Sequence, residues 1–377
     1  MIRSLEAVLL LSGMIIGAGM FAVPFSFAQA GFWLGVAELA VLTIAVVTLH
    51  LFYGEVVLAT PRSHQLPGYA RTHLGFAPSV LAWVSAVAGM NGALLAYILV
   101  GSLFLTAIGG TVFSGFTPDL GAAVLVASGA LVTFFPLRRE ALVNGVLTAC
   151  LIGFIIFLIG LLAPRVEPVH LAGFHPEKFF LPYGVLLFAL SGGTVIPEVV
   201  AVVRRNAHAA RAAIIIGSIL PAFLYLGFAW VAVGVAGNGV SKEAIAGLAR
   251  FVGSRAALVG SIIGFLAVFT SFIALSSSFQ SLLELDFHLP GRAAWFLGSA
   301  VAPLLYLIGF KDFIRVISFV GIFALGIDAA LVIAMRHRIR SRASGRIRPL
   351  ALAWEAAILA LVLAGVLYET SGLLSLF

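Results

Sequence analysis

Ser12-Gly13-Met14-Ile15-Ile16-Gly17-Ala18-Gly19-Met20-Phe21-Ala22-Val23-Pro24 lies inside the first long apolar segment, where a membrane helix is expected. Three glycines and a proline weaken a helix here, since glycine costs about 1 kcal/mol relative to alanine and proline lacks a backbone donor. In hydrocarbon, an open backbone group persists only beside protein or a wet cavity. The stretch therefore predicts an interrupted helix whose backbone faces a ligand. Close packing between helices is the alternative.

The composition is that of a polytopic membrane protein. Of the 377 residues, 62% are hydrophobic and 10% are charged, and a soluble domain does not need so much apolar surface. The first segment has no small-residue cleavage site before a hydrophilic chain, so we expect a retained span. The single Cys150 gives no disulfide framework or metal cluster, and no cofactor is expected. The net charge of +7 does not indicate nucleic acid, because most basic residues fall in alternate loops.

Eleven spans are expected, and the basic residues orient them. With the N-terminus inside, fifteen of the 22 Lys and Arg residues face the cytoplasm, so the C-terminus is outside. We expect a multi-pass, monomeric protein of the plasma (inner) membrane, surrounded by lipid bilayer. Short helices are predicted on the cytoplasmic face (Pro67 to Leu74) and over the external entrance (Ser241 to Val252). The predicted spans are 5–28, 32–58, 79–108, 119–137, 140–163, 180–203, 209–235, 255–285, 290–309, 313–335 and 349–369.

A second interruption lies in span 6, at Phe188-Ala189-Leu190-Ser191-Gly192-Gly193-Thr194-Val195-Ile196-Pro197-Glu198. Span 1 runs outward and span 6 inward, so the two broken spans begin five-span blocks of opposite orientation. These blocks are residues 5–163 and 180–335, and residues 349–369 form an extra span. The pattern predicts one all-α transporter domain over 1–377, with a 5+5 inverted repeat and its substrate between the breaks.

The stretch Ile16–Pro24 resembles the first-span signature of amino acid permeases of the amino acid–polyamine–organocation superfamily. It is most similar to the aromatic and hydroxy amino acid permeases and to the neutral amino acid and auxin permease branch. Glu55, Ile196-Pro197 and Thr270-Ser271-Phe272 resemble further motifs of this family. Leu190–Gly192 stand where those aromatic permeases have a histidine. The resemblance implies the LeuT-type fold, amino acid transport, and, as in sodium-coupled relatives, an ion between spans 1 and 8.

The two breaks form the predicted substrate site. An amino acid zwitterion needs a partner at each charged end. Free amides that begin the outer half of span 1 suit the carboxylate, and carbonyls at the span 6 break suit the ammonium. The side-chain pocket is small or apolar and uncharged, so a neutral, hydrophobic or aromatic amino acid is expected. An interhelical hydrogen bond is the alternative role for Asn91. The predicted substrate-binding residues are Ile16, Gly17, Ala18, Gly19, Met20, Asn91, Phe188, Ala189, Leu190, Ser191 and Gly192.

Spans 1 and 8 contain a predicted ion site. Its three carbonyls and two hydroxyls form a five-oxygen cage without a carboxylate, which suits Na⁺. Alternatively, the hydroxyls bond carbonyls of their own helix. The predicted ligands are Gly13, Ile16, Ala267, Thr270 and Ser271.

Three acids inside spans are candidate proton carriers or gates, because buried membrane carboxylates are costly and usually functional. Glu198 follows Pro197 in span 6, with a salt bridge to Arg204 or Arg205 as its alternative role. Asp328 lies in span 10 and Glu38 in span 2.

The sequence thus predicts a secondary active symporter that takes up neutral amino acids by alternating access. Proton-coupled and uncoupled carriers remain alternatives. A channel would need a continuous polar stripe along several spans, and a membrane enzyme would need clustered His, Asp or Cys. Neither pattern is present, so no covalent chemistry is expected.

Overall fold

The computed structural model describes residues 2–62, 64–135, 140–344 and 349–374, and every regular element in these ranges is helical. The α-helices are α1 (Ile2–Ile15), α2 (Gly19–Ala30), α3 (Phe32–Ala59), α4 (Leu66–Leu74), α5 (Phe76–Gly109), α6 (Pro118–Thr133), α7 (Glu140–Leu162), α8 (Phe180–Ala189), α9 (Ile196–Val202), α10 (Ala207–Ala236), α11 (Ile245–Val252), α12 (Ser254–Asp286), α13 (Gly291–Leu307), α14 (Phe313–Ser344) and α15 (Pro349–Leu374). The 3-10 helices are η1 (Ala163–Arg165), η2 (Pro168–Leu171), η3 (Pro176–Lys178), η4 (Gly193–Val195) and η5 (Gly237–Gly239).

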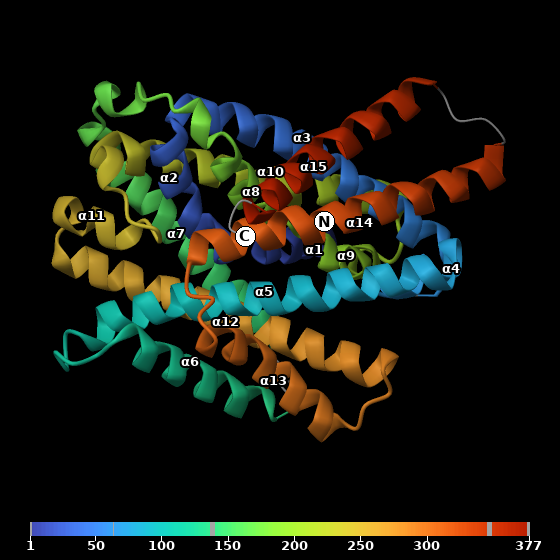
Figure 1. The fold of residues 1–377 in the computed structure, drawn as a ribbon, viewed down its shortest axis with the longest axis horizontal. Coiled ribbons are helices and arrows are strands. Elements are labelled where there is room, and N and C mark those ends of the chain that lie inside the picture. Colours follow the sequence, from blue (N-terminus) through green and yellow to red (C-terminus); the bar gives the residue numbers. More distant parts are fainter. Residues whose placement is uncertain (1, 63, 136–139, 345–348, 375–377) are drawn as a thin grey trace.

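The helices form one bundle, in which α5 and α14 run along the long axis of the molecule (Figure 1). Helix α4 lies near one end of this axis and α11 near the other. Within the described residues, seven helical segments are long and apolar enough to cross a membrane, or eight with α1 and α2 as one span. The all-helical membrane architecture is confirmed, whereas the count of eleven spans stays a prediction.

Both predicted interruptions are confirmed. Helices α1 and α2 meet at an angle of 55°, and α8 ends at Ala189, before η4 and α9. Pro24 lies inside α2 and does not end it, so the first break coincides with Gly17 and Ala18. Pro197 lies in the first turn of α9, where its missing N–H has no helical partner to lose.

The two breaks touch each other through Gly19. A Cβ at this position would lie 2.7 Å from the Cα of Ala189 and 3.0 Å from the Phe188 ring. A Cβ could be accommodated only if the backbone moved, so Gly19 allows α2 to approach the end of α8 this closely. The glycine that weakens the helix is therefore also the contact between the breaks.

At the α4 end of the molecule, Arg205 holds the last turn of α3. Its Nη2 donates to the carbonyls of Val57 at 2.7 Å, Leu58 at 3.0 Å and Thr60 at 2.7 Å. These are carbonyls that a helix C-terminus leaves without partners. Glu198 is exposed and forms no salt bridge with Arg205 or any other residue that the structure describes.

At the α11 end, ion pairs connect the loops. Lys242, just before α11, lies 2.9 Å from Asp312, and Lys311 lies 2.7 Å from Asp119. Partial burial raises the pKa of Asp312, but the hydrogen bonds from Lys242 and the Arg315 amide, together with the two positive charges, outweigh it, so the pKa lies below its usual 3.8. The Tyr306 hydroxyl also donates to Asp119, at 2.6 Å. These contacts tie α6, α13 and α14 together under α11.

Between α2 and α3 the chain turns at Gly31, with φ of +111°. A side chain is strained in this region, and a Cβ would also collide with the Gly173 carbonyl. The amide of His175 donates to the Ala30 carbonyl at 2.9 Å. The connection from α7 to α8 is therefore packed against this turn.

Candidate functional site

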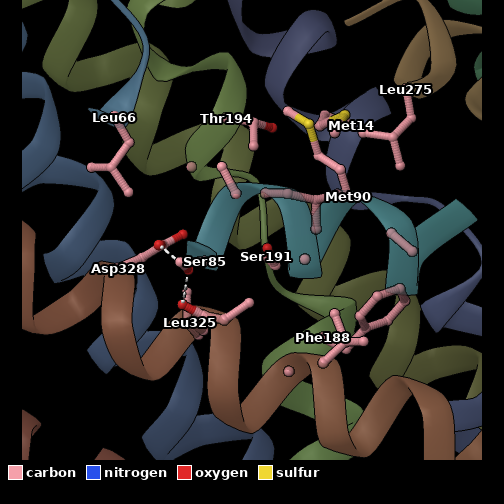
Figure 2. Close-up of a pocket in the computed structure, with 18 of the residues that line it drawn as sticks. Met14, Leu66, Ser85, Met90, Phe188, Ser191, Thr194, Leu275, Leu325 and Asp328 are labelled. Carbon is pink, nitrogen blue, oxygen red and sulfur yellow. Dashed lines mark hydrogen bonds between the residues drawn. The ribbon is translucent and has the colours of Figure 1, made fainter. Parts of the chain in front are cut away.

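A cavity of about 150 Å³ lies beside both helix breaks. Figure 2 shows its wall, with Phe188, Met90 and Met14 toward one end and Asp328 and Ser85 toward the other. The structure thus brings five of the eleven predicted substrate-binding residues to one cavity. These five are Gly17, Ala18, Gly19, Phe188 and Ser191.

The cavity extends from the breaks toward the α4 end of the molecule. Its lining includes His50 and Tyr53 from the second half of α3, and Gln65 and Leu66 at the start of α4. None of its lining residues belongs to α11 or to the segment between α7 and α8. The cavity thus extends from the breaks toward the end at which the sequence predicts the cytoplasmic face.

The first break presents free backbone amides. The Gly17 amide donates to the Ile15 carbonyl at 2.8 Å, whereas the amides of Ala18 and Gly19 have no acceptor in the described ranges. Both residues line the cavity, and Gly19 begins α2. Unpaired amides at a helix N-terminus favour an anion. This geometry can bind a carboxylate at the position predicted from the sequence.

Tyr225 of α10 links the two breaks and was not identified from the sequence. Its hydroxyl lies 2.7 Å from the carbonyl oxygen of Ile15 and 2.9 Å from that of Ala189. Tyr225 is fully buried, and a buried tyrosine usually finds a polar partner for its hydroxyl. The only sign of this role in the sequence is that a tyrosine stands inside an apolar span. The Ala189 carbonyl, predicted to accept the substrate ammonium, already has a donor.

The other predicted substrate-binding residues lie outside the cavity wall. Ile16, Met20 and Leu190 are at most 2% exposed and pack in the core. At Gly192, a Cβ would lie 2.6 Å from the Ile15 side chain, so this glycine permits close packing against α1. These residues therefore pack the breaks against the protein core and do not face the cavity.

Asn91 is buried beside the cavity but does not line it. Its Nδ2 donates to the Val87 carbonyl of its own helix at 2.8 Å, and its Oδ1 has no donor among the described residues. The neighbouring Met90 lines the cavity. Substrate contact by Asn91 therefore stays a prediction, and the one bond it makes is within its own helix.

Asp328 of α14 is the only acid among the residues that line the cavity. Its Oδ1 accepts a hydrogen bond from the Ser85 hydroxyl of α5 at 2.7 Å (Figure 2). Two further polar groups in the lining are buried without a partner in the described chain, the His50 Nε2 and the Tyr53 hydroxyl. The His50 Nδ1 lies 2.9 Å from the Ser218 hydroxyl. The α4 end of the cavity is therefore its polar end.

The other two candidate acids are not in the cavity wall. Glu38 is 6% exposed, and neither of its carboxylate oxygens has a hydrogen-bond donor within the described ranges. Glu198 is exposed on α9. Among the three candidates, only Asp328 lies in the cavity wall.

Of the predicted Na⁺ ligands, Gly13 lies on α1, Ile16 in the break after it, and the other three on α12; both helices contact α7. The Thr270 hydroxyl donates to the carbonyls of Leu266 and Ala267 at 3.1 and 3.0 Å, which is the alternative arrangement within its own helix. The face of Gly13 lies against Thr148 of α7, whose Oγ1 would be 3.3 Å from a Cβ there. Ile16 is buried, and Ser271 is partly exposed.

The fold is shared with solved transporter structures. Mhp1, a nucleobase-cation-symport-1 family transporter solved in a closed conformation with bromovinylhydantoin bound, superposes with a TM-score of 0.68 at 14% identity, over 93% of this chain and 80% of that one. An inward-facing Mhp1 structure gives 0.70 at 14% identity, over 97% and 88%. MhsT in complex with L-phenylalanine gives 0.65 at 14% identity, over 96% and 98%. These proteins have the LeuT fold.

The chain thus has the LeuT fold of the transporters Mhp1 and MhsT, with a cavity beside its two broken helices. Residues 2–369 match the model of the tryptophan/tyrosine permease family. The protein belongs to this family, as the resemblance in span 1 implied. No individually curated protein sequence matches the chain significantly.

Proposed function

We propose that the protein is a cation-coupled symporter that takes up neutral, hydrophobic or aromatic amino acids by alternating access. The observation that supports this most directly is the cavity at the contact between the breaks, with the free amides of Ala18 and Gly19 in its wall. The substrate carboxylate binds these amides, and its ammonium meets carbonyls at the end of α8. The side chain then lies along Phe188 and Met90.

The lining of the cavity supports a neutral substrate. Near the breaks it consists of small, apolar and uncharged polar groups, and a charged side chain without a partner there costs several kcal/mol. The family is named for the transport of tryptophan and tyrosine, and MhsT was solved in complex with L-phenylalanine. Phenylalanine, tyrosine and tryptophan should therefore compete better than lysine or glutamate.

Two coupling ions are candidates. Sodium at Gly13, Ile16, Ala267, Thr270 and Ser271 remains our prediction from oxygen ligands, although the Thr270 hydroxyl donates within its own helix. A proton on Asp328 is the second candidate, favoured by the place of this acid in the cavity wall. A carboxylate bonded to Ser85 can bind a proton on one side of the membrane and release it on the other as its surroundings change.

Uptake of labelled phenylalanine into proteoliposomes, with sodium and proton gradients imposed separately, tests this proposal. Proton coupling predicts uptake that a protonophore abolishes, and Asp328→Asn should lose accumulation while retaining counterflow. Glu198→Gln is the matched control, because this acid follows the second break but does not line the cavity. Uptake driven by sodium alone, with Asp328→Asn unaffected, would exclude the proton site. Uptake that needs neither gradient would make the protein a uniporter.

A further inference from the structure

A second cavity, of about 630 Å³, lies on the outside of the bundle between α14, α15 and the end of α4. It shares no residue with the cavity at the breaks. Its walls are mostly apolar and include Ile333, Ala334, Leu352 and Leu359. We name this cavity, with the polar residues at its end, the α14–α15 groove.

Basic side chains lie at the end of the groove. Arg338, His337 and Ser341 line it, and Arg342 follows one turn after Arg338. Burial, Arg342 and Arg338 all lower the pKa of His73 in α4, so both guanidinium groups act on this neighbouring ring. Two arginines of α14 therefore make one end of the groove positive, next to α4.

The acids nearby already have partners. Glu355 is the only acid among the residues that line the groove, and it forms a buried ion pair with Arg336. Glu55 accepts from Arg336 at 2.7 Å and from Arg340 at 3.0 Å. Neither Arg338 nor Arg342 has an acidic partner among the residues that the structure describes. No acidic side chain in the described ranges therefore neutralises the charges of these two arginines.

The length of α14 determines where Arg338 and Arg342 lie relative to the bilayer. Its 32 residues span about 48 Å at 1.5 Å per residue, whereas the hydrocarbon core is about 30 Å thick. The basic end of α14 thus reaches beyond the core, while Ile333 and Ala334, about a turn earlier, remain nearer to it. The groove runs from headgroup depth into acyl-chain depth.

We propose that the α14–α15 groove binds an anionic phospholipid. The phosphate lies on Arg338 and Arg342, with the Ser341 hydroxyl as a further donor, and an acyl chain follows Ala334 and Leu359. Charge-assisted bonds hold the headgroup, and the apolar wall of the groove packs against the acyl chain. Free inorganic phosphate has only the first contribution and should bind far more weakly.

Native mass spectrometry and thermal melting of the purified full-length protein test this site. Phosphatidylglycerol should stay bound and raise the Tm, whereas phosphatidylcholine and inorganic phosphate should not. The double substitution Arg338→Gln and Arg342→Gln should weaken phosphatidylglycerol binding by roughly 30-fold, since each arginine near a membrane surface contributes roughly fivefold. Arg255→Gln is the matched control, because this arginine is exposed at the start of α12, far from the groove.

A second variant separates the chain from the headgroup. Ala334→Trp fills the groove without changing the charge, and Ala334 is exposed, so the fold should tolerate it. Loss of lipid retention in both the double arginine variant and Ala334→Trp supports the site. Equal retention of phosphatidylcholine, or unchanged phosphatidylglycerol binding in the double variant, would overturn it. Loss in the arginine variant alone, with Ala334→Trp like wild type, would show a surface charge effect and also overturn it.

Discussion

Tyr225→Phe tests whether the two broken helices must be joined for substrate to bind. The substitution removes the hydroxyl that lies 2.7 Å from the Ile15 carbonyl and 2.9 Å from the Ala189 carbonyl. Ile15 retains the Gly17 amide at 2.8 Å, but no other described donor reaches Ala189. The change therefore removes one shared hydrogen bond and leaves one buried carbonyl unsatisfied.

A buried hydrogen bond contributes about 1 kcal/mol, and an unsatisfied buried group costs about 1–3 kcal/mol. We expect the free energy of unfolding to fall by about 2–4 kcal/mol. The arrangement of the breaks that binds substrate should become less populated, and a loss of about 1.4 kcal/mol there raises the Kd about tenfold.

Tyr183→Phe is the matched control. The Tyr183 hydroxyl also donates to a backbone carbonyl, that of Leu361, at 2.7 Å, but outside the cavity at the breaks. Melting in detergent gives the stability of each variant, and isothermal titration with phenylalanine gives its Kd. Tyr183→Phe should lose stability and retain the wild-type Kd. If Tyr225→Phe also retained the wild-type Kd, the bond would stabilise the bundle alone and our reasoning about the breaks would be refuted.

Two further predictions concern single positions. Gly19→Ala should abolish the rise in Tm that substrate causes, because the new Cβ would lie 2.7 Å from the Ala189 Cα. Gly193→Ala is the control, since Gly193 also lines the cavity but has open space around its Cβ, so this variant should fold and bind substrate. Equal substrate-induced shifts in Tm for both variants would contradict the prediction. Asp312→Asn should cost less than about 1 kcal/mol, since the pair with Lys242 is partly exposed. The pKa of Asp312 is lowered, so its contribution is present above pH 3.8 and is lost as the pH falls through the folded-state value. A melting curve that responds to Asp312→Asn equally at pH 7 and pH 3 would show that this pair has no such role.

The sequence predicted the features that depend on local backbone chemistry. Glycines inside apolar segments predicted both interruptions, and amphipathic spacing in two loops predicted short helices close to α4 and α11. Pro24 does not mark the interruption, because α2 continues through it. The break depends on the glycine segment before it.

Contacts between distant spans could not be predicted in this way. Ser85 and Asp328 are 243 positions apart, and their contact depends on how α5 and α14 are rotated. In a membrane bundle the lipid-facing and buried sides are both apolar, so hydrophobic periodicity does not determine that rotation. The same reason concealed Tyr225, whose hydroxyl could have faced any neighbour. A salt bridge to Arg205 was the alternative role considered for Glu198, and instead Arg205 donates to helix-end carbonyls.

The attachment of Arg205 to the end of α3 gives this helix the mechanics of a lever. Its 28 residues make a rod of about 42 Å, held at one end by the loop between α9 and α10 and turning at the other on Gly31. A tilt of about 5° about the held end moves the far end by about 4 Å for a rod of that length. A tilt about the end that Arg205 holds would therefore displace the Gly31 end of α3 by about the width of a methyl group while the held end stays in place.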